Sequence, residues 1–139
     1  MSARIAKKIS PADVTPNLRR GGELRTLLSP ATVGSTAGFL GVATLGMGEY
    51  IAEHYHPYSE EFLYLASGTV EARCDGVAIA LHTGDGLYVP IGVRHRITNN
   101  GRVPALVVFA LTPLAPRPDL GHVETETVPA PATTAVDQP

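Results

Sequence analysis

The sequence predicts an all-β protein, an antiparallel β-sandwich or barrel built as one domain. Its apolar residues occur in short runs, several of which alternate with polar residues, and glycine separates most of them. The chain of 139 residues contains 14 glycines and 12 prolines, which favours many turns between short strands. Helical periodicity is nearly absent. With 44% hydrophobic and 17% charged residues, the composition is typical of a globular domain with a core.

We expect three parts along the chain. They are an N-terminal arm over 1–22, a β domain over 23–112 and a proline-rich C-terminal region over 113–139. In the arm, the best helix candidate is a short turn over 10–14, where Ser10 can cap the turn and Pro11 can take its first position.

The β domain contains nine candidate strands. In chain order they are LRTLL, GFLGVATL, EYIAEHYH, EFLYLA, TVEARC, VAIAL, GLYVP, HRIT and ALVVFAL. Strands at this spacing are typical of sandwiches and barrels. Two hairpin turns are predicted between them, an Asp-Gly turn over 74–77 and a second turn in NNGR over 99–102.

The C-terminal region differs in composition from the β domain. It contains six prolines and few large apolar residues. This composition predicts an extended arm followed by a disordered tail. His122 lies in this polar segment, and we expect its side chain to be in solvent.

Charge is unevenly distributed, although the net charge is only −2. Residues 1–30 contain six Lys or Arg and two acidic residues, which gives +4, and the remainder contains five basic and eleven acidic residues, which gives −6. The basic start is either a solvated segment or a surface that docks an acidic partner. It lacks the interleaved aromatic residues of a nucleic-acid surface, so we expect no nucleic-acid partner.

Cysteine usage and hydropathy predict a cytoplasmic protein. Cys74 is the only cysteine, which excludes an internal disulfide and fits a reducing compartment. The N-terminus is basic but has no apolar stretch typical of a secretory signal. The longest apolar run, over 105–111, is too short to span a bilayer.

Two histidines lie close together in the segment EHYHPYSEEFLYLASG, over 53–68. In a strand, residues i and i+2 share a face, so His54 and His56 are expected to point the same way. Paired imidazoles near a carboxylate suit a divalent metal. A strand end in solvent can also carry two such histidines. A third candidate ligand elsewhere in the sequence is therefore needed to distinguish a metal site from a solvated strand end.

A third histidine follows in GDGLYVPIGVRHRITNN, over 84–100. Pro90 and Gly92 predict a turn directly before His95. If His95 begins the next strand, its side chain emerges beside this turn, as expected for a ligand on a neighbouring strand. Arg94 and Arg96 then face the other way.

These two segments resemble the two sequence motifs of the cupin family. The matching positions are Gly48, His54, His56, Glu61 and Gly68 in the first motif, and Gly84, Pro90, Gly92, His95 and Asn99 in the second. The resemblance implies a cupin double-stranded β-helix over 23–112. It also implies that His54, His56, Glu61 and His95 bind one divalent metal ion, with Asn99 making other contacts.

The choice of Glu61 over its neighbour follows from strand parity. Glu61 shares a face with Leu63 and Leu65 and lies six residues before Gly68, as the motif requires. Glu60 is expected at the rim, and if the strand register differs, Glu60 becomes the ligand instead.

Strand parity also predicts a cavity that is largely apolar. Tyr50 is expected on the face of His54, and Leu63 and Leu65 on the face of Glu61, which suits a flat organic substrate. Four protein ligands leave one or two positions on a metal open, as in catalytic sites. For a general base, we consider a metal-bound hydroxide, Glu60 and His82, and the sequence does not choose among them.

A closer resemblance covers roughly residues 17–126. The segments RRGGELRTLLSPATVG, EYIAEHYHPYSEEFLYL, VPIGVRHRITN and PLAPRPDLGHVETE are similar to the small cupins of aromatic (type II) polyketide pathways, as in tetracenomycin, resistomycin and spore-pigment biosynthesis. The resemblance implies a metal-dependent polyketide cyclase acting on a poly-β-ketone, which an acidic acyl carrier protein could deliver. The expected metal is Zn²⁺, with Fe, Ni or Mn as alternatives.

Two other functions remain open at this point, a cupin dioxygenase acting on an aromatic substrate and a non-enzymatic cupin that binds a small molecule. We also expect a homodimer with N-terminal contacts, because LRTLL could add to a partner's sheet edge.

Overall fold

The computed structural model describes residues 5–128 and consists mainly of β-strands. The strands are β1 (Glu23–Leu28), β2 (Phe39–Leu45), β3 (Tyr50–Tyr55), β4 (Glu60–Ser67), β5 (Thr69–Cys74), β6 (Val77–His82), β7 (Gly86–Val89), β8 (His95–Thr98), β9 (Ala105–Thr112) and β10 (Val123–Glu124). The helices are η1 (Pro11–Asp13), α1 (Pro30–Val33) and η2 (Pro118–Leu120). None of these helices is long enough to cross a membrane. The predicted all-β fold is therefore confirmed.

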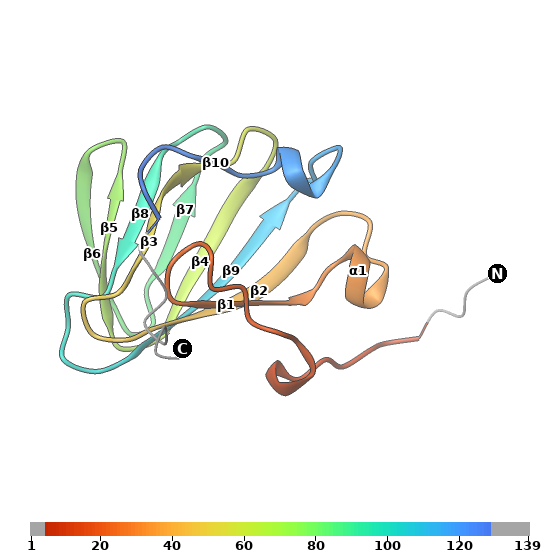
Figure 1. Cartoon of the computed structure of the whole chain (residues 1–139), viewed down its shortest axis with the longest axis horizontal. Helices are drawn as coiled ribbons and strands as arrows, with labels where there is room; N and C mark the ends of the chain where they lie inside the picture. The colour runs from red at the N-terminus through yellow and green to blue at the C-terminus, as the bar shows by residue number, and fades with distance from the viewer. Residues whose placement is uncertain (1–4, 129–139) are drawn as a thin grey trace, which may run out of the picture.

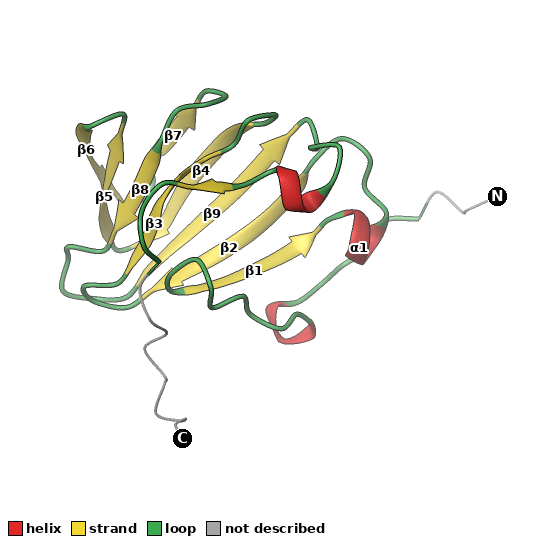
Figure 2. Cartoon of the chain, turned by 45° about the horizontal axis from the view of Figure 1, so that its top comes forward, coloured by secondary structure: helices red, strands yellow, loops and turns green. Residues whose placement is uncertain are grey.

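The strands form two antiparallel sheets that face each other (Figures 1 and 2). One sheet has the order β1-β2-β9-β4-β7 and the other has the order β10-β3-β8-β5-β6. Chain neighbours therefore often lie in different sheets, as β3 and β4 do. The inward residues of both sheets form one core, in which Leu45, Leu65, Ile97 and Val107 are almost completely buried. This two-sheet arrangement brings β3, which carries His54, and β4, which carries Glu61, into opposite sheets.

One of the two predicted hairpin turns forms. Asp75 and Gly76 both have positive φ, at 47° and 82°, and they join β5 to β6 in a two-residue hairpin. The second prediction, for 99–102, is wrong because β8 pairs with β3 and β5, whereas β9 pairs with β2 and β4. Residues 99–102 instead begin a crossover between the sheets.

Asn99 holds this crossover in place. It is completely buried. Its Nδ2 donates to the carbonyl oxygens of Leu45 and Val103, each at 2.9 Å, and its Oδ1 accepts from the backbone N–H of Gly101, also at 2.9 Å. The side chain therefore satisfies three backbone groups, which agrees with the expectation that Asn99 makes backbone contacts.

Both terminal segments pack against β3. The carbonyl of Arg20 accepts a hydrogen bond from the backbone N–H of Ala52 at 3.0 Å. At Gly21, where φ is 105°, an added Cβ would lie 1.9 Å from the carbonyl oxygen of Tyr50, so only glycine permits this approach. The short strand β10 also pairs with β3 and places Val123 opposite Tyr55. Residues 129–139, which include most of the predicted disordered tail, lie outside the described part of the chain.

Candidate metal centre

Three histidines and one glutamate meet between the two sheets. His54 is on β3 and His95 is directly opposite it on β8. His56 follows β3, and Glu61 lies on β4 in the other sheet. All four side chains are buried, and one ligand atom from each lies within 4.8 Å of the others. The structure thus brings together the four residues that the cupin motifs predict as metal ligands.

Backbone carbonyls fix the orientation of each imidazole. His54 Nδ1 lies 2.7 Å from the carbonyl oxygen of Ala52, and His95 Nδ1 lies 3.0 Å from that of Val93. His56 Nδ1 lies 2.8 Å from the carbonyl oxygen of Gly121. Because a carbonyl only accepts, each Nδ1 carries a proton, which leaves each neutral Nε2 with a free lone pair. Such backbone contacts are typical of metal-binding histidines.

Several atoms at the centre of the cluster have no hydrogen-bond partner among the described residues. They are the Nε2 atoms of His56 and His95 and Oε1 of Glu61. Glu61 Oε1 lies 2.8 Å from His95 Nε2 and 3.3 Å from His56 Nε2. Buried polar atoms without hydrogen-bond partners lower the stability of a folded protein. A cation bound by all of these atoms would remove this penalty. Imidazole and carboxylate ligands suit Zn²⁺ and related divalent metals, so the residues fit a bound metal ion.

The electrostatics of the cluster keep the carboxylate ionised. Burial raises the pKa of Glu61, but the His56 and His95 imidazoles beside its carboxylate outweigh burial and lower that pKa to about 2. Burial, together with repulsion from His95, lowers the pKa of His54 to about 3, so this imidazole is neutral. Burial also disfavours protonated His95, but the Glu61 carboxylate outweighs it and raises the pKa of His95. The ionised Glu61 carboxylate thus supplies one negative charge for a cation.

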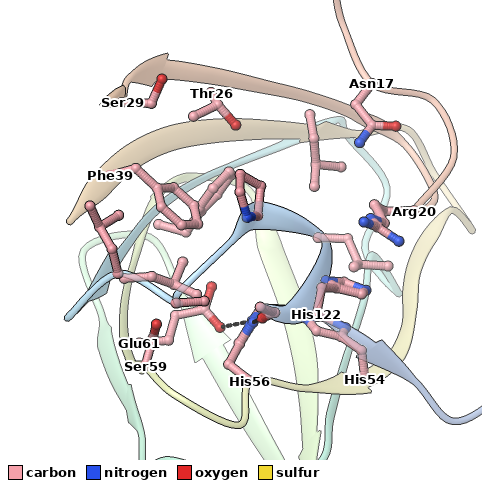
Figure 3. Close-up of a pocket in the computed structure, with 18 of the residues that line it drawn as sticks. Asn17, Arg20, Thr26, Ser29, Phe39, His54, His56, Ser59, Glu61 and His122 are labelled. Atoms are coloured by element: carbon pink, nitrogen blue, oxygen red, sulfur yellow. Dashed lines mark hydrogen bonds and ion pairs between the residues drawn. The ribbon is translucent and has the colours of Figure 1, made fainter. Parts of the chain in front are cut away.

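The cluster lies in a cavity of about 640 Å³ that is mainly apolar. Large side chains from both sheets form its walls, namely Leu24, Phe39, Ile51, Leu63, Ile97, Val107, Phe109 and Leu111. A volume of this size suits a ligand of several rings. Figure 3 shows Asn17, Thr26 and Ser29 across the cavity from His54 and His56, with Arg20 on the side of His122, so a few polar groups line the mainly apolar cavity.

Two of the three predicted cavity residues lie elsewhere. Leu63 lines the cavity, but Tyr50 does not, because a β-bulge between Ile51 and His54 adds a residue to β3 and reverses the parity. Ile51 occupies the cavity wall instead, and Tyr50 packs under the guanidinium of Arg96, 3.9 Å from its ring centre. Leu65 has the predicted parity, but it lies in the core beyond the cavity.

Neither side chain predicted as a general base reaches the cavity. Glu60 lies on the opposite face of β4 from Glu61, where its carboxylate accepts a hydrogen bond from the Tyr88 hydroxyl at 3.2 Å. His82 is at the end of the edge strand β6, with its side chain 73% exposed, 3.7 Å from the Asp85 carboxylate. The structure therefore places both of these candidate bases outside the cavity, with Glu60 away from the metal ligands as expected. The chosen strand register, with Glu61 facing inward, agrees with the structure.

His122 is the cavity residue that sequence reasoning missed. It was expected in solvent, but its ring stacks on that of His54 with centroids 4.2 Å apart and planes 12° from parallel. Burial, with repulsion from His54, lowers the pKa of His122 to about 2. The local sequence carries no strand pattern that predicts this placement, because β10 contains only two residues.

The C-terminal segment over 113–126 brings His122 to the cavity (Figure 1, blue). Beyond β10, the Glu126 carboxylate accepts from the backbone N–H of Glu53 at 2.7 Å and lies 3.4 Å from the Arg96 guanidinium. Arg20 of the N-terminal arm lies 3.5 Å from the Glu124 carboxylate, which joins the two terminal segments. Both segments therefore form part of the cavity wall.

We expect that ending the chain at Thr112 weakens metal binding about 10–100-fold, because this removes the Gly121 carbonyl that orients His56 and the His122 ring beside His54. Loss of a group that orients a metal ligand typically costs this much. The measurement is a competition titration of zinc against a chelator, with circular dichroism to check that the sheets remain. A chain ending at Val128 keeps every cavity residue and is the control. Equal affinities in the two chains would contradict the prediction.

Comparison with known proteins identifies the family. The cupin domain model matches residues 41–111. The chain belongs to the cupin family. It is 56% identical over 126 residues to protein SchB of Streptomyces halstedii, with 91% of each chain covered. It is 52% identical over 127 residues to the tetracenomycin polyketide synthase protein TcmJ of Streptomyces glaucescens, covering 91% of this chain and 85% of TcmJ.

Solved structures support the cupin architecture. A double-stranded β-helix protein from Klebsiella pneumoniae matches with a TM-score of 0.64 and 22% identity, over 91% of this cupin and all of that chain. At that identity the likeness shows the fold alone. The predicted double-stranded β-helix and the predicted likeness to polyketide-pathway cupins are both confirmed.

Proposed function

We propose that this cupin is a metal-dependent polyketide cyclase that closes and aromatises a ring of a poly-β-ketone in an aromatic polyketide pathway. One observation carries the proposal, namely that four buried ligand residues meet in a mainly apolar cavity of about 640 Å³. The names of the relatives, which include a tetracenomycin polyketide synthase protein, support the substrate class.

The proposed reaction is an intramolecular aldol condensation. A methylene between two carbonyls loses a proton, its carbon bonds to a distant carbonyl carbon, and that carbonyl oxygen takes up a proton. Loss of one water then gives a double bond of the new aromatic ring. A bound divalent cation, most simply Zn²⁺, would supply Lewis-acid polarisation of the substrate carbonyls. The sequence of steps consumes no oxidant.

The residues of the cavity position the substrate and exclude water. Phe39 and Phe109 meet edge to face, with ring centroids 6.4 Å apart, and form an apolar corner of the cavity against which a planar intermediate can pack. Folding a flexible chain against such walls brings its reacting carbons together. His122 is neutral, and with so low a pKa it is too weak a base to hold a proton at neutral pH, so we assign it a hydrogen bond to a substrate oxygen.

The proposal includes how the polyketide substrate reaches this protein and where in the cell the protein acts. The net charge of +4 over residues 1–30 suits an acidic acyl carrier protein, and Arg20 in this segment lines the cavity. We place the protein in the cytoplasm, because its single cysteine fits a reducing compartment.

The test compares turnover of a linear or partly cyclised polyketide with and without oxygen, using protein of measured metal content. We expect cyclised product without oxygen, loss of activity after chelation, and recovery when zinc is returned. A requirement for oxygen, with oxygen atoms in the product, would replace the cyclase by the rival cupin dioxygenase. Tight binding of the substrate without turnover under either condition would favour a non-enzymatic binding cupin.

A further inference from the structure

One wall of the cavity carries a positive charge that the proposed ring closure does not use. Arg20 is the only Lys or Arg among the described residues that line the cavity. Figure 3 shows its guanidinium between Asn17 and the side of the cavity where His122 lies. The Arg20 side chain is only 31% exposed, so its charge acts more strongly on a nearby ligand than it would in bulk water. We call Asn17, Arg20 and His122 the polar wall.

The charge of Arg20 is only loosely paired within the chain. Oε2 of Glu124 lies 3.5 Å from Nη1 of Arg20, which is longer than a normal hydrogen bond. An ion pair that is partly open to water, as this one is, contributes little to stability and holds its partners weakly. A guanidinium carries five N–H donors in a planar fork, and Glu124 contacts one of the three nitrogens. The other donors of Arg20 therefore remain available to a ligand.

The two neighbours of Arg20 on the polar wall also offer polar hydrogens. Oδ1 of Asn17 accepts from the backbone N–H of Arg19 at 2.8 Å, which leaves the amide nitrogen of Asn17 to donate. Nε2 of His122 is buried and has no hydrogen-bond partner among the described residues. It lies 3.6 Å from the same Glu124 oxygen that approaches Arg20. A carboxylate oxygen thus already fits between Arg20 and His122.

The chemistry of the polar wall favours a carboxylate over a phosphate. A phosphate monoester carries a charge of about −1.5 to −2 at pH 7, which one guanidinium does not balance. A carboxylate carries one charge, and its two oxygens lie in a plane that matches the planar fork of Arg20. The rest of the cavity is mainly apolar, with Phe39 and Phe109 at one corner. This combination suits a planar ligand with a single acid group at one end.

We propose that Arg20 binds a carboxylate of the ligand, with Asn17 and His122 donating to the same group, and that the substrate is therefore a planar polyketide acid. The inference rests on the proposed function for the apolar part of the ligand and adds its charged end. A polyketide that has been released from its carrier protein ends in a carboxylate, whereas a carrier-bound chain ends in a neutral thioester. The polar wall thus favours a released chain as the molecule that occupies the cavity.

The test is calorimetric titration of the zinc-loaded protein with 2-naphthoate and with 2-naphthamide, its neutral counterpart of nearly the same shape. We expect the unchanged protein to bind naphthoate more tightly than naphthamide. Arg20→Gln should weaken naphthoate binding about 10–100-fold, because a hydrogen bond to a charged group is lost, and should affect naphthamide much less. Arg19→Gln is the matched control, because it removes the same charge from an exposed neighbour that does not line the cavity.

Two further measurements separate Arg20 from the metal and from a folding defect. Carboxylates also bind metal ions, so the titrations are repeated on metal-free protein, where the preference for naphthoate should persist. Glu124→Gln removes the negative charge beside Arg20 and should tighten naphthoate binding about two- to fivefold. Circular dichroism and zinc bound per subunit check that each variant is folded. If Arg20→Gln does not fold, Glu124→Gln tests the same charge.

Three results would overturn the proposal. The first is an Arg20→Gln variant that folds and keeps the full preference for naphthoate, or a Glu124→Gln variant that binds naphthoate no more tightly. The second is a preference that disappears with the zinc, which would assign the carboxylate to the metal. The third is equal binding of naphthoate and naphthamide by the unchanged protein, which would favour a neutral, carrier-bound substrate. None of them bears on cyclisation without oxygen, because these titrations involve no turnover.

Discussion

Replacing His54, His56 or His95 by alanine is expected to remove the metal from the purified protein and to abolish turnover. Each change deletes one ligand of a four-residue cluster and leaves a hole lined by buried polar atoms. Loss of a group that merely orients a ligand costs about 10–100-fold in metal affinity, and loss of the ligand itself should cost at least 100-fold. Metal per subunit, measured by elemental analysis, checks the result.

The adjacent glutamates provide a matched pair for the same measurement. Glu61→Gln should weaken metal binding, because the ionised Glu61 carboxylate is the only negative charge in the cluster. Glu60→Gln should leave the metal content unchanged, because Glu60 faces away from the cavity and binds Tyr88. If Glu60→Gln strips the metal and Glu61→Gln does not, the register of β4 is wrong. If every ligand variant keeps its metal, the metal site itself is wrong.

Asn99→Ala is expected to lower the free energy of unfolding by about 3–5 kcal/mol. The change leaves the carbonyls of Leu45 and Val103 and the N–H of Gly101 without their hydrogen-bond partner. A buried polar group that loses its partner costs about 1–3 kcal/mol. Because domains are stable by only about 5–15 kcal/mol, the loss is a large share of the total.

Urea denaturation, followed by circular dichroism, measures this loss. The control is Asn100→Ala, since Asn100 is the exposed neighbour and should change the free energy of unfolding by less than about 0.5 kcal/mol. A decrease of less than about 1 kcal/mol in the free energy of unfolding of Asn99→Ala would contradict the prediction. It would mean that water replaces the hydrogen bonds of the amide. The affinity for metal provides a second readout, because Asn99 directly follows β8, the strand that begins with His95.

Local rules were sufficient for the strands, and the resemblance to the cupin motifs selected the four residues that meet in the cavity. Short alternating runs predicted the β-rich fold, because a strand with one buried face repeats every two residues. The same period selected Glu61 over Glu60, and both motif segments placed their histidines on adjacent strands. The Asp75-Gly76 hairpin was also predictable, because that turn needs two residues that tolerate positive φ.

Departures from a regular strand were not predictable in the same way. One extra residue between Ile51 and His54 turned Tyr50 outward and placed Ile51 in the cavity wall. The sequence carries no signal for this bulge, because it depends on how β3 pairs with β8. The failed hairpin at 99–102 has a similar cause, since strand partners are set by the packing of whole sheets rather than by the turn residues.

The sequence by itself determined the strands, the cupin motifs and the identity of the four predicted metal ligands, because these depend on residue type and on spacing within a few residues. Only the tertiary structure decided what surrounds them. It excluded Glu60 and His82 from the cavity, and it brought His122 and the Gly121 carbonyl to the metal ligands from a segment that has no pattern of its own. The physical reason is that these contacts join residues more than sixty positions apart, and they form only when both sheets and both terminal segments pack together.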